Sequence, residues 1–126
     1  MEGSNVRVTR EDGVAMAALD GEIDLVNAAD VAERLSTGID GASAMIIDLQ
    51  GVLFMDSQAI ALLDRLSARL EGEGCPVVVV APPQSVPRRV LEIVDLGIEL
   101  FDRVDDARAA VASRVASTDG SITPSS

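Results

Sequence analysis

An apolar segment followed by a polar junction and then a helical pattern constrains the fold more than any other part of the chain. Residues 45–49 are mostly apolar, as is typical of a strand covered on both faces in a mostly parallel sheet packed between helices. After the junction, apolar residues recur at steps of three and four, which predicts a helix with one buried face formed by Ala59, Ile60, Leu63, Leu66 and Leu70. Asp56 and Ser57 then lie at the helix N-terminus, where a side chain can cap free N–H groups and negative charge is tolerated. If the chain has one chemical site, the sequence places it at this junction.

The segment before this unit predicts a hairpin and a helix. Two apolar stretches separated by a turn signal at residues 11–13 predict the hairpin over residues 6–19, and Gly21 permits a bend where the second strand continues. A helix then follows Asn27, the expected N-cap, and ends near Gly38. Its expected buried face consists of Ala28, Val31, Leu35 and Ile39.

The segment after the central unit predicts a strand, a helix, a short strand and a last helix. Residues 75–80 form an apolar, β-branched run, and Ser85 can cap the helix that follows. We expect a short edge strand within residues 98–104 and a last helix capped by Asp105 or Asp106. The apolar stripe expected on the helix after Ser85 consists of Val86, Val90, Ile93 and Val94.

The order of these elements predicts an α/β fold. We expect a mixed sheet of about five strands with a parallel centre, packed by about four helices. A chain of 126 residues is the size of one domain, which we place at residues 1–116. Residues 117–126 are small and polar, and we expect a flexible C-terminal tail there.

The charge balance favours a protein partner. The chain carries 21 acidic and 10 basic residues, a formal net charge of -11, whereas nucleic-acid binding requires a clustered basic face. We therefore expect no nucleic-acid ligand and favour a basic protein surface. No apolar signal core and no run long enough to span a membrane are present, so we expect a cytoplasmic protein without membrane contact.

The composition removes most enzyme chemistries. The chain has no histidine, which excludes the commonest general base and any Ser-His-Asp or Cys-His pair. Cys75 is the single cysteine, so no intramolecular disulfide forms, and we expect an inert thiol. No metal-ligand spacing and no glycine-rich phosphate loop that opens a helix are present. We expect no catalytic residues, no metal and no cofactor.

Several segments together resemble the STAS domain, and in style the bacterial anti-sigma factor antagonists. They are Gly21-Glu22-Ile23-Asp24, Ile47-Asp48-Leu49, the run from Val52 to Ser57, the helix entry at residues 81–97 and Phe101-Asp102-Arg103-Val104. The resemblance covers roughly residues 6–115 and implies a STAS-type fold. It also implies that the protein is a switch: it binds an anti-sigma factor, in this family often an ATP-dependent serine kinase, and so releases a sigma factor.

The resemblance also implies which residues act. Ser57 is the expected phosphorylation site, and phosphorylation by the kinase breaks the complex until a serine phosphatase resets it. Asp56 is expected to position the hydroxyl and to contact the partner. The expected partner-binding residues are Gly21, Glu22, Asp24, Asp56, Ser57, Gln58 and Ile60. We expect a monomer or a weak dimer.

The sequence departs from the family pattern directly after Ser57. The family usually continues with Ser or Thr, then Gly, whereas this chain has Gln58 and Ala59. Replacing the glycine restricts the backbone and is expected to add a methyl group where a partner approaches.

Two other functions fit the same residues. A small STAS protein can be an accessory subunit of a signalling assembly or a transporter, without phosphorylation. A small enzyme could use Asp56 as base and Ser57 as nucleophile, although an aspartate without histidine activates a hydroxyl poorly.

Overall fold

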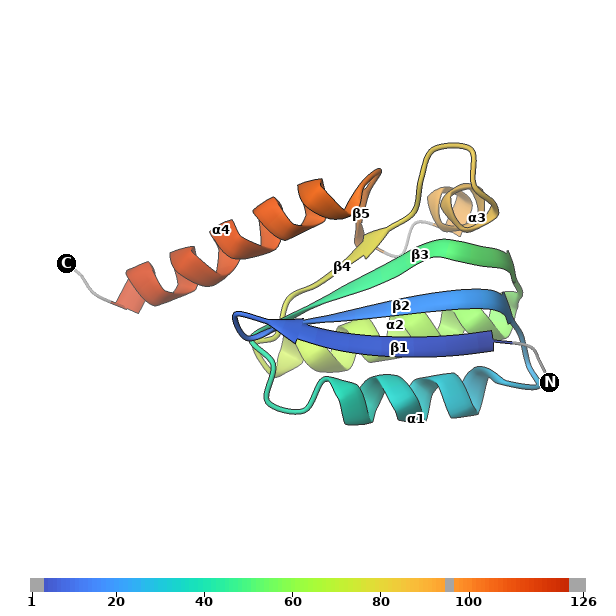
Figure 1. Ribbon diagram of the computed structural model, residues 1–126, viewed down its shortest axis with the longest axis horizontal. Coiled ribbons are helices and arrows are strands. Elements are labelled where there is room, and N and C mark those ends of the chain that lie inside the picture. Colours follow the sequence, from blue (N-terminus) through green and yellow to red (C-terminus); the bar gives the residue numbers. More distant parts are fainter. Residues whose placement is uncertain (1–3, 95–96, 123–126) are drawn as a thin grey trace.

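The computed structural model describes residues 4–94 and 97–122, which form one five-stranded sheet and four helices (Figure 1). In chain order the elements are β1 (Ser4–Glu11), β2 (Val14–Ile23), α1 (Ala28–Gly38), β3 (Ala44–Met55), α2 (Ser57–Gly72), β4 (Val77–Val80), α3 (Val86–Val94), β5 (Glu99–Phe101) and α4 (Val104–Ile122). The strands are arranged in the order β1-β2-β3-β4-β5. Among the helices that the structure describes, none has the length and hydropathy of a membrane-spanning segment.

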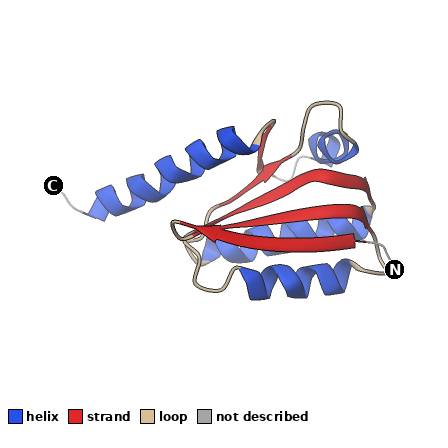
Figure 2. Ribbon diagram, viewed as in Figure 1, coloured by secondary structure: helices blue, strands red, loops and turns tan. Residues whose placement is uncertain are grey.

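The sheet is mixed, as the order of elements predicted. β1 pairs antiparallel with β2, and each later neighbour pairs parallel. The hairpin turns at Asp12 and Gly13, whose φ values of 54° and 80° suit a tight two-residue turn. Helices lie on both sides of the sheet (Figure 2), so the predicted α/β fold is confirmed.

Both faces of the central strands are buried because alternate side chains enter different cores. Met45 and Ile47 of β3 face the larger core, which α1 and α2 cover. Ile46 faces the smaller core, where Ala107 and Val111 of α4 pack. β3 is thus covered on both faces, as its apolar run predicted.

The buried side of α3 differs from the prediction. Pro87 and Leu91 are buried, whereas Val86, Ile93 and Val94 are exposed. The apolar arc of α3 is wider than the strip that contacts the core, so periodicity alone could not tell which part of the arc faces inward. On α2, Leu62 is buried in addition to the predicted Ala59, Leu63, Leu66 and Leu70, while Ile60 is half-buried.

The predicted helix starts were correct in part. Ser85 caps α3, because its Oγ accepts a hydrogen bond from the Arg88 N–H at 3.2 Å. α4 begins at Val104, so Asp105 and Asp106 lie in its first turn, near the positive end of the helix dipole, and do not cap it. α4 continues to Ile122, residues 123–126 lie outside the described residues, and the proposed tail stays a prediction.

Candidate functional site

The parallel pairing of β2 and β3 brings two connections together at the carboxyl ends of these strands. Ile23, the last residue of β2, pairs with Met55, the last residue of β3. The Asp56 N–H then donates a hydrogen bond to the Ile23 carbonyl oxygen at 3.2 Å. The β2–α1 loop and the β3–α2 junction therefore lie side by side. Figure 1 shows both connections at the same end of the sheet.

The Asp56 carboxylate binds backbone N–H groups of both connections. Its Oδ1 accepts hydrogen bonds from Gln58 N–H at 2.9 Å and Ala59 N–H at 3.1 Å, which caps α2. Its Oδ2 accepts one from Leu25 N–H at 2.9 Å. Desolvation raises the pKa of the Asp56 carboxyl, but these backbone hydrogen bonds outweigh it and hold the pKa below its ordinary value. Asp56 is thus ionised at neutral pH and poorly suited to act as a general base.

Ser57 is the first residue of α2, and its side chain is exposed. Within the described residues its hydroxyl makes no hydrogen bond, to Asp56 or to any other group. Gln58 is exposed beside it. An incoming protein can therefore reach the Ser57 hydroxyl without displacing other side chains.

Ala59 corrects one expectation drawn from the sequence. Its exposed fraction is 0 %, and it belongs to the larger core. The methyl group that replaces the family's glycine therefore points into the protein and not toward a partner. The departure from the family pattern leaves the surface around Ser57 unchanged at this position.

The β2–α1 loop is held by its own side chains. Gly21 has φ 86°, and the register with β3 shifts between Gly21 and Glu22, which confirms the expected bend. Asp24 Oδ1 accepts hydrogen bonds from Val26 N–H at 3.0 Å and Asn27 N–H at 3.3 Å.

Asn27 is the N-cap residue of α1, as predicted, but its side chain makes no capping hydrogen bond and bonds back into the loop. Its Oδ1 accepts a hydrogen bond from Asp24 N–H at 3.0 Å, and its Nδ2 donates one to the Glu22 carbonyl oxygen at 2.8 Å. These bonds fix the loop backbone, while the side chains of Leu25 and Val26 are exposed.

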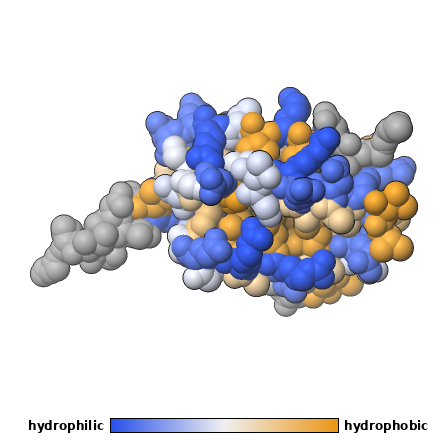
Figure 3. Space-filling model, turned by 90° about the horizontal axis from the view of Figure 1, so that it is seen from below, coloured by the Kyte–Doolittle hydropathy of each residue, from blue (hydrophilic) through white to orange (hydrophobic). Residues whose placement is uncertain are grey.

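Four exposed apolar side chains lie on the two segments that meet at the junction, and the sequence reasoning did not identify them. Leu25 and Val26 of the β2–α1 loop are 69 % and 90 % exposed, and Leu53 and Phe54 at the end of β3 are 72 % and 46 % exposed. We call these four residues the apolar rim. Figure 3 shows hydrophobic surface at the right-hand end of the molecule, where Figure 1 places the β2–α1 loop. The sequence could have indicated this surface, because two pairs of consecutive apolar residues, Leu25-Val26 and Leu53-Phe54, lie next to the expected strand ends.

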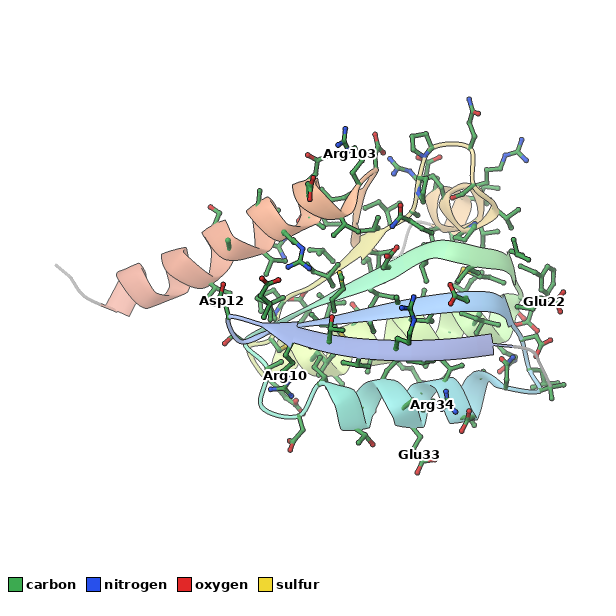
Figure 4. All side chains as sticks on the ribbon, viewed as in Figure 1. Arg10, Asp12, Glu22, Glu33, Arg34 and Arg103 are labelled. Carbon is green, nitrogen blue, oxygen red and sulfur yellow. The ribbon has the colours of Figure 1, made fainter. Side chains whose placement is uncertain are left out.

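The predicted partner-binding residues come from these two connections. Gly21 and Glu22 lie at the end of β2 and Asp24 in the loop that follows, and Figure 4 shows Glu22 at this end of the molecule. Asp56, Ser57 and Gln58 lie on the second connection, with the half-buried Ile60 in the first turn of α2. Their role in binding stays a prediction.

The described residues offer little for catalysis or metal binding. Among them, no group of three or more His, Cys, Asp or Glu side chains could hold a metal ion. Cys75 is buried, and burial together with the carboxylates of Glu71 and Glu73 raises the pKa of its thiol, so the thiol stays protonated and unreactive.

Comparison with known proteins gives the family. The model of the STAS domain family matches residues 5–107. The chain belongs to the STAS domain family. This STAS protein is 34% identical over 109 residues to the anti-sigma-F factor antagonist RsfB of Mycobacterium tuberculosis, which covers 84% of this chain and 88% of the relative.

Solved structures show the same fold. An anti-sigma factor antagonist from Mycobacterium paratuberculosis superimposes with a TM-score of 0.74 and 30% identity, covering 87% of this chain and 95% of the other. The unphosphorylated form of the anti-sigma factor antagonist SpoIIAA gives a TM-score of 0.72 and 21% identity, covering 86% of this chain and 97% of the other. The predicted STAS-type fold is confirmed.

Proposed function

We propose that this STAS protein is an anti-sigma factor antagonist: it binds an anti-sigma factor through the surface around Ser57, and phosphorylation of Ser57 turns binding off. The observation that carries the proposal is an exposed hydroxyl at the start of α2 beside the apolar rim. Relatives that are at least 30% identical and bear the name anti-sigma factor antagonist support the general function. In this proposal the protein acts by binding in the cytoplasm and catalyses no reaction.

The apolar rim supplies the attraction. Burying exposed apolar side chains contributes about 25 cal/mol per Å² of apolar surface removed from water. Because Leu25 and Val26 are held on a loop fixed by Asp24 and Asp56, little conformational freedom is lost when a partner covers them. Basic residues at the edge of an apolar partner surface would also be attracted by the net charge of -11.

Phosphorylation would oppose that attraction by charge. A phosphate adds about -1.5 to -2 charges to Ser57, beside the ionised Asp56. A like-charge contact at about 4 Å costs up to about 4 kcal/mol at an effective dielectric of about 20, nearly three decades in affinity. The favourable term from the α2 dipole, about 0.3 to 1 kcal/mol, is smaller. A partner that places a carboxylate or an apolar surface over Ser57 is therefore released.

The proposed enzymes of the switch are the partner and a phosphatase. The anti-sigma factor is proposed to be an ATP-dependent serine kinase that phosphorylates the Ser57 hydroxyl, and a serine phosphatase is proposed to restore it. The absence of any competing hydrogen bond to this hydroxyl within the described residues supports its access to a kinase.

Capture from an extract of the source organism tests the proposal. The full chain is used as bait with wild type, Ser57→Ala and Ser57→Glu, and captured proteins are identified by mass spectrometry. Ser43→Glu is the matched control, because Ser43 is exposed before β3, at the opposite end of the parallel strands. We expect an anti-sigma factor on wild type, Ser57→Ala and Ser43→Glu, but not on Ser57→Glu. Equal capture by Ser57→Ala and Ser57→Glu would contradict control by charge at this residue.

The alternative is a STAS accessory subunit that is never phosphorylated. The family departure at the exposed Gln58, directly after Ser57, favours it. Intact mass after incubation with the captured partner and ATP separates the two functions: the switch predicts one added phosphate on wild type and none on Ser57→Ala. The accessory subunit predicts an unchanged mass for both.

A further inference from the structure

β1 is one of the two edge strands of the sheet and is paired on one side only. Its register with β2 is continuous, without a bulge, and the pair Glu11 and Val14 closes the two-residue turn. In such a turn the closing pair is joined by hydrogen bonds. This pair therefore sets which residues of β1 direct their backbone groups toward β2.

Hydrogen-bonded pairs alternate along an antiparallel ladder. Arg7 and Thr9 therefore direct their N–H and C=O groups toward β2, like the closing pair. Val6, Val8 and Arg10 direct theirs away from the sheet, to the open edge. The outer edge of β1 thus offers a row of unpaired donors and acceptors, the pattern that an added strand completes.

A groove runs along this open edge, between β1 and α1. It has a volume of about 470 Å³ and is lined by Val6, Val8, Asp30, Glu33, Arg34, Thr37 and Gly38, and we call it the β1–α1 groove. Val6 and Val8 are half-buried and give it an apolar floor. Figure 1 shows α1 running alongside β1, and Figure 3, seen from the α1 side, shows hydrophobic surface between hydrophilic side chains.

β1 carries three charged side chains: Glu11 is paired with Arg108, Arg7 lies on the face of the strand opposite to Val6 and Val8, and Arg10 is held at the end of α1. A charged side chain can shield an edge, but Arg10 donates hydrogen bonds to the carbonyl oxygens of Gly38 and Asp40 at the end of α1. Figure 4 shows Arg10 at that end of the strand, with Arg34 and Glu33 on α1. β1 contains no proline.

The charges around the groove favour a basic occupant. Arg34 is paired with Asp30 at 3.4 Å, and within the described residues Glu33 has no ion pair. A second copy of this chain would bring the same acidic α1 against itself, at a net charge of -11 for each copy. The observations therefore favour a partner segment with a basic side chain.

We propose that the β1–α1 groove binds an extended peptide segment of a partner protein as a sixth strand, hydrogen-bonded to Val6 and Val8. In the bound peptide, the side chains that lie over Val6 and Val8 are apolar, and a side chain near Asp30 and Glu33 is basic. This surface is separate from Ser57 and does not depend on phosphorylation.

The test measures binding of a peptide with this apolar and basic pattern to the full chain. The probe is fluorescein-labelled Thr-Val-Thr-Val-Thr-Lys, and its matched control ends in Glu instead of Lys. We expect fluorescence anisotropy to show that wild type binds the Lys peptide about two- to fivefold more tightly than the Glu peptide, the size of an exposed ion pair. Glu33→Lys should reverse the preference, whereas Asp64→Lys, on the exposed side of α2, should keep it.

Amide hydrogen exchange followed by NMR identifies the added strand. In the free protein, Val6 and Val8 amides should exchange quickly while those of Arg7 and Thr9 are protected. Saturating Lys peptide should slow exchange at Val6 and Val8 by about tenfold or more. The same peptide N-methylated at its valines should not bind, because those N–H groups complete the ladder.

Three outcomes would overturn the proposal. They are equal binding of the N-methylated peptide, binding without protection at Val6 and Val8, and protection there that rises with protein concentration in the absence of peptide. The last outcome would assign the edge to a second copy of the chain. Ser57→Glu should leave peptide affinity unchanged, so this test is independent of the proposed switch.

Discussion

The carboxylate of Asp56, which caps α2, also accepts a hydrogen bond from the Leu25 N–H at 2.9 Å. One side chain thereby joins the turn that carries Ser57 to the loop that carries half of the apolar rim. Asp56 therefore positions two parts of the proposed binding surface, and its effect on a partner is expected to act through the Leu25 backbone.

Replacing Asp56 by asparagine should flatten the pH dependence of stability in acid. The pKa of Asp56 is below the ordinary aspartate value of 3.8, so the unfolded state binds more protons and stability increases with pH. This contribution is fully present above the unfolded pKa and is lost as the pH falls through the lowered folded pKa. Urea unfolding followed by far-UV circular dichroism, between about pH 2 and 7, should show a steeper acid loss for wild type than for Asp56→Asn. Parallel curves would contradict this role.

Polar substitutions in the apolar rim should weaken partner binding without unfolding the protein. For Leu25→Ser and Val26→Ser we expect a change in unfolding free energy within about 0.5 kcal/mol, since both side chains are exposed. The affinity for the captured anti-sigma factor should fall about tenfold or more, as calorimetry can measure. Ile93→Ser, on an equally exposed position of α3, reports whether the partner also covers that helix. Unchanged affinity in both loop variants would contradict binding at the rim.

Gly38→Ala should destabilise the protein because α1 lies close to β1 at this residue. A Cβ at Gly38 would lie 2.6 Å from Val8 Cγ2, and overpacking of this kind costs about 1–3 kcal/mol. The matched control is Gly72→Ala, where nothing lies within 4 Å and alanine favours the helix. Adding Val8→Ala to Gly38→Ala should recover part of the loss in urea unfolding, and strictly additive effects would argue against the contact.

Arg88→Ala should loosen the attachment of α3. The Arg88 guanidinium donates to the Ala81 carbonyl oxygen at 2.9 Å, to Asp102 at 2.8 Å and to Glu92 at 2.8 Å, and its side chain is only 20% exposed. We expect a loss of about 1–3 kcal/mol in unfolding free energy, a smaller loss for Arg88→Lys, and about 0.5 kcal/mol or less for the exposed Arg89→Ala. Equal effects of Arg88→Ala and Arg89→Ala would show that these contacts contribute nothing to the free energy of unfolding.

The sequence predicted those parts of the fold that local pattern determines. The apolar run around Ile46 and Ile47 indicated a strand buried on both faces, and the polar pair Asp56 and Ser57 marked the start of α2. Both features depend on neighbours in the chain, through side-chain alternation and helix capping, so no tertiary information was needed.

Features that depend on contacts between distant elements could not be predicted. The bond from Leu25 to Asp56 spans 31 positions, and the burial of Ala59 depends on how α2 meets the sheet. On α3, Val86 and Leu91 belong to one apolar arc, and only the docking of the helix decides that Leu91 is inside. Periodicity gives the arc, whereas packing selects the buried side.

The placement of both connections at the end of the parallel strands separates the requirements of the fold from those of recognition. The residues that hold β2 and β3 together are interior, while Leu25, Val26 and Ser57 project from turns whose backbone is anchored by Asp24 and Asp56. Side chains on these turns can be exchanged during evolution at little cost to the scaffold. Duplicated copies of such a gene could therefore acquire different partners through a few substitutions while keeping one architecture.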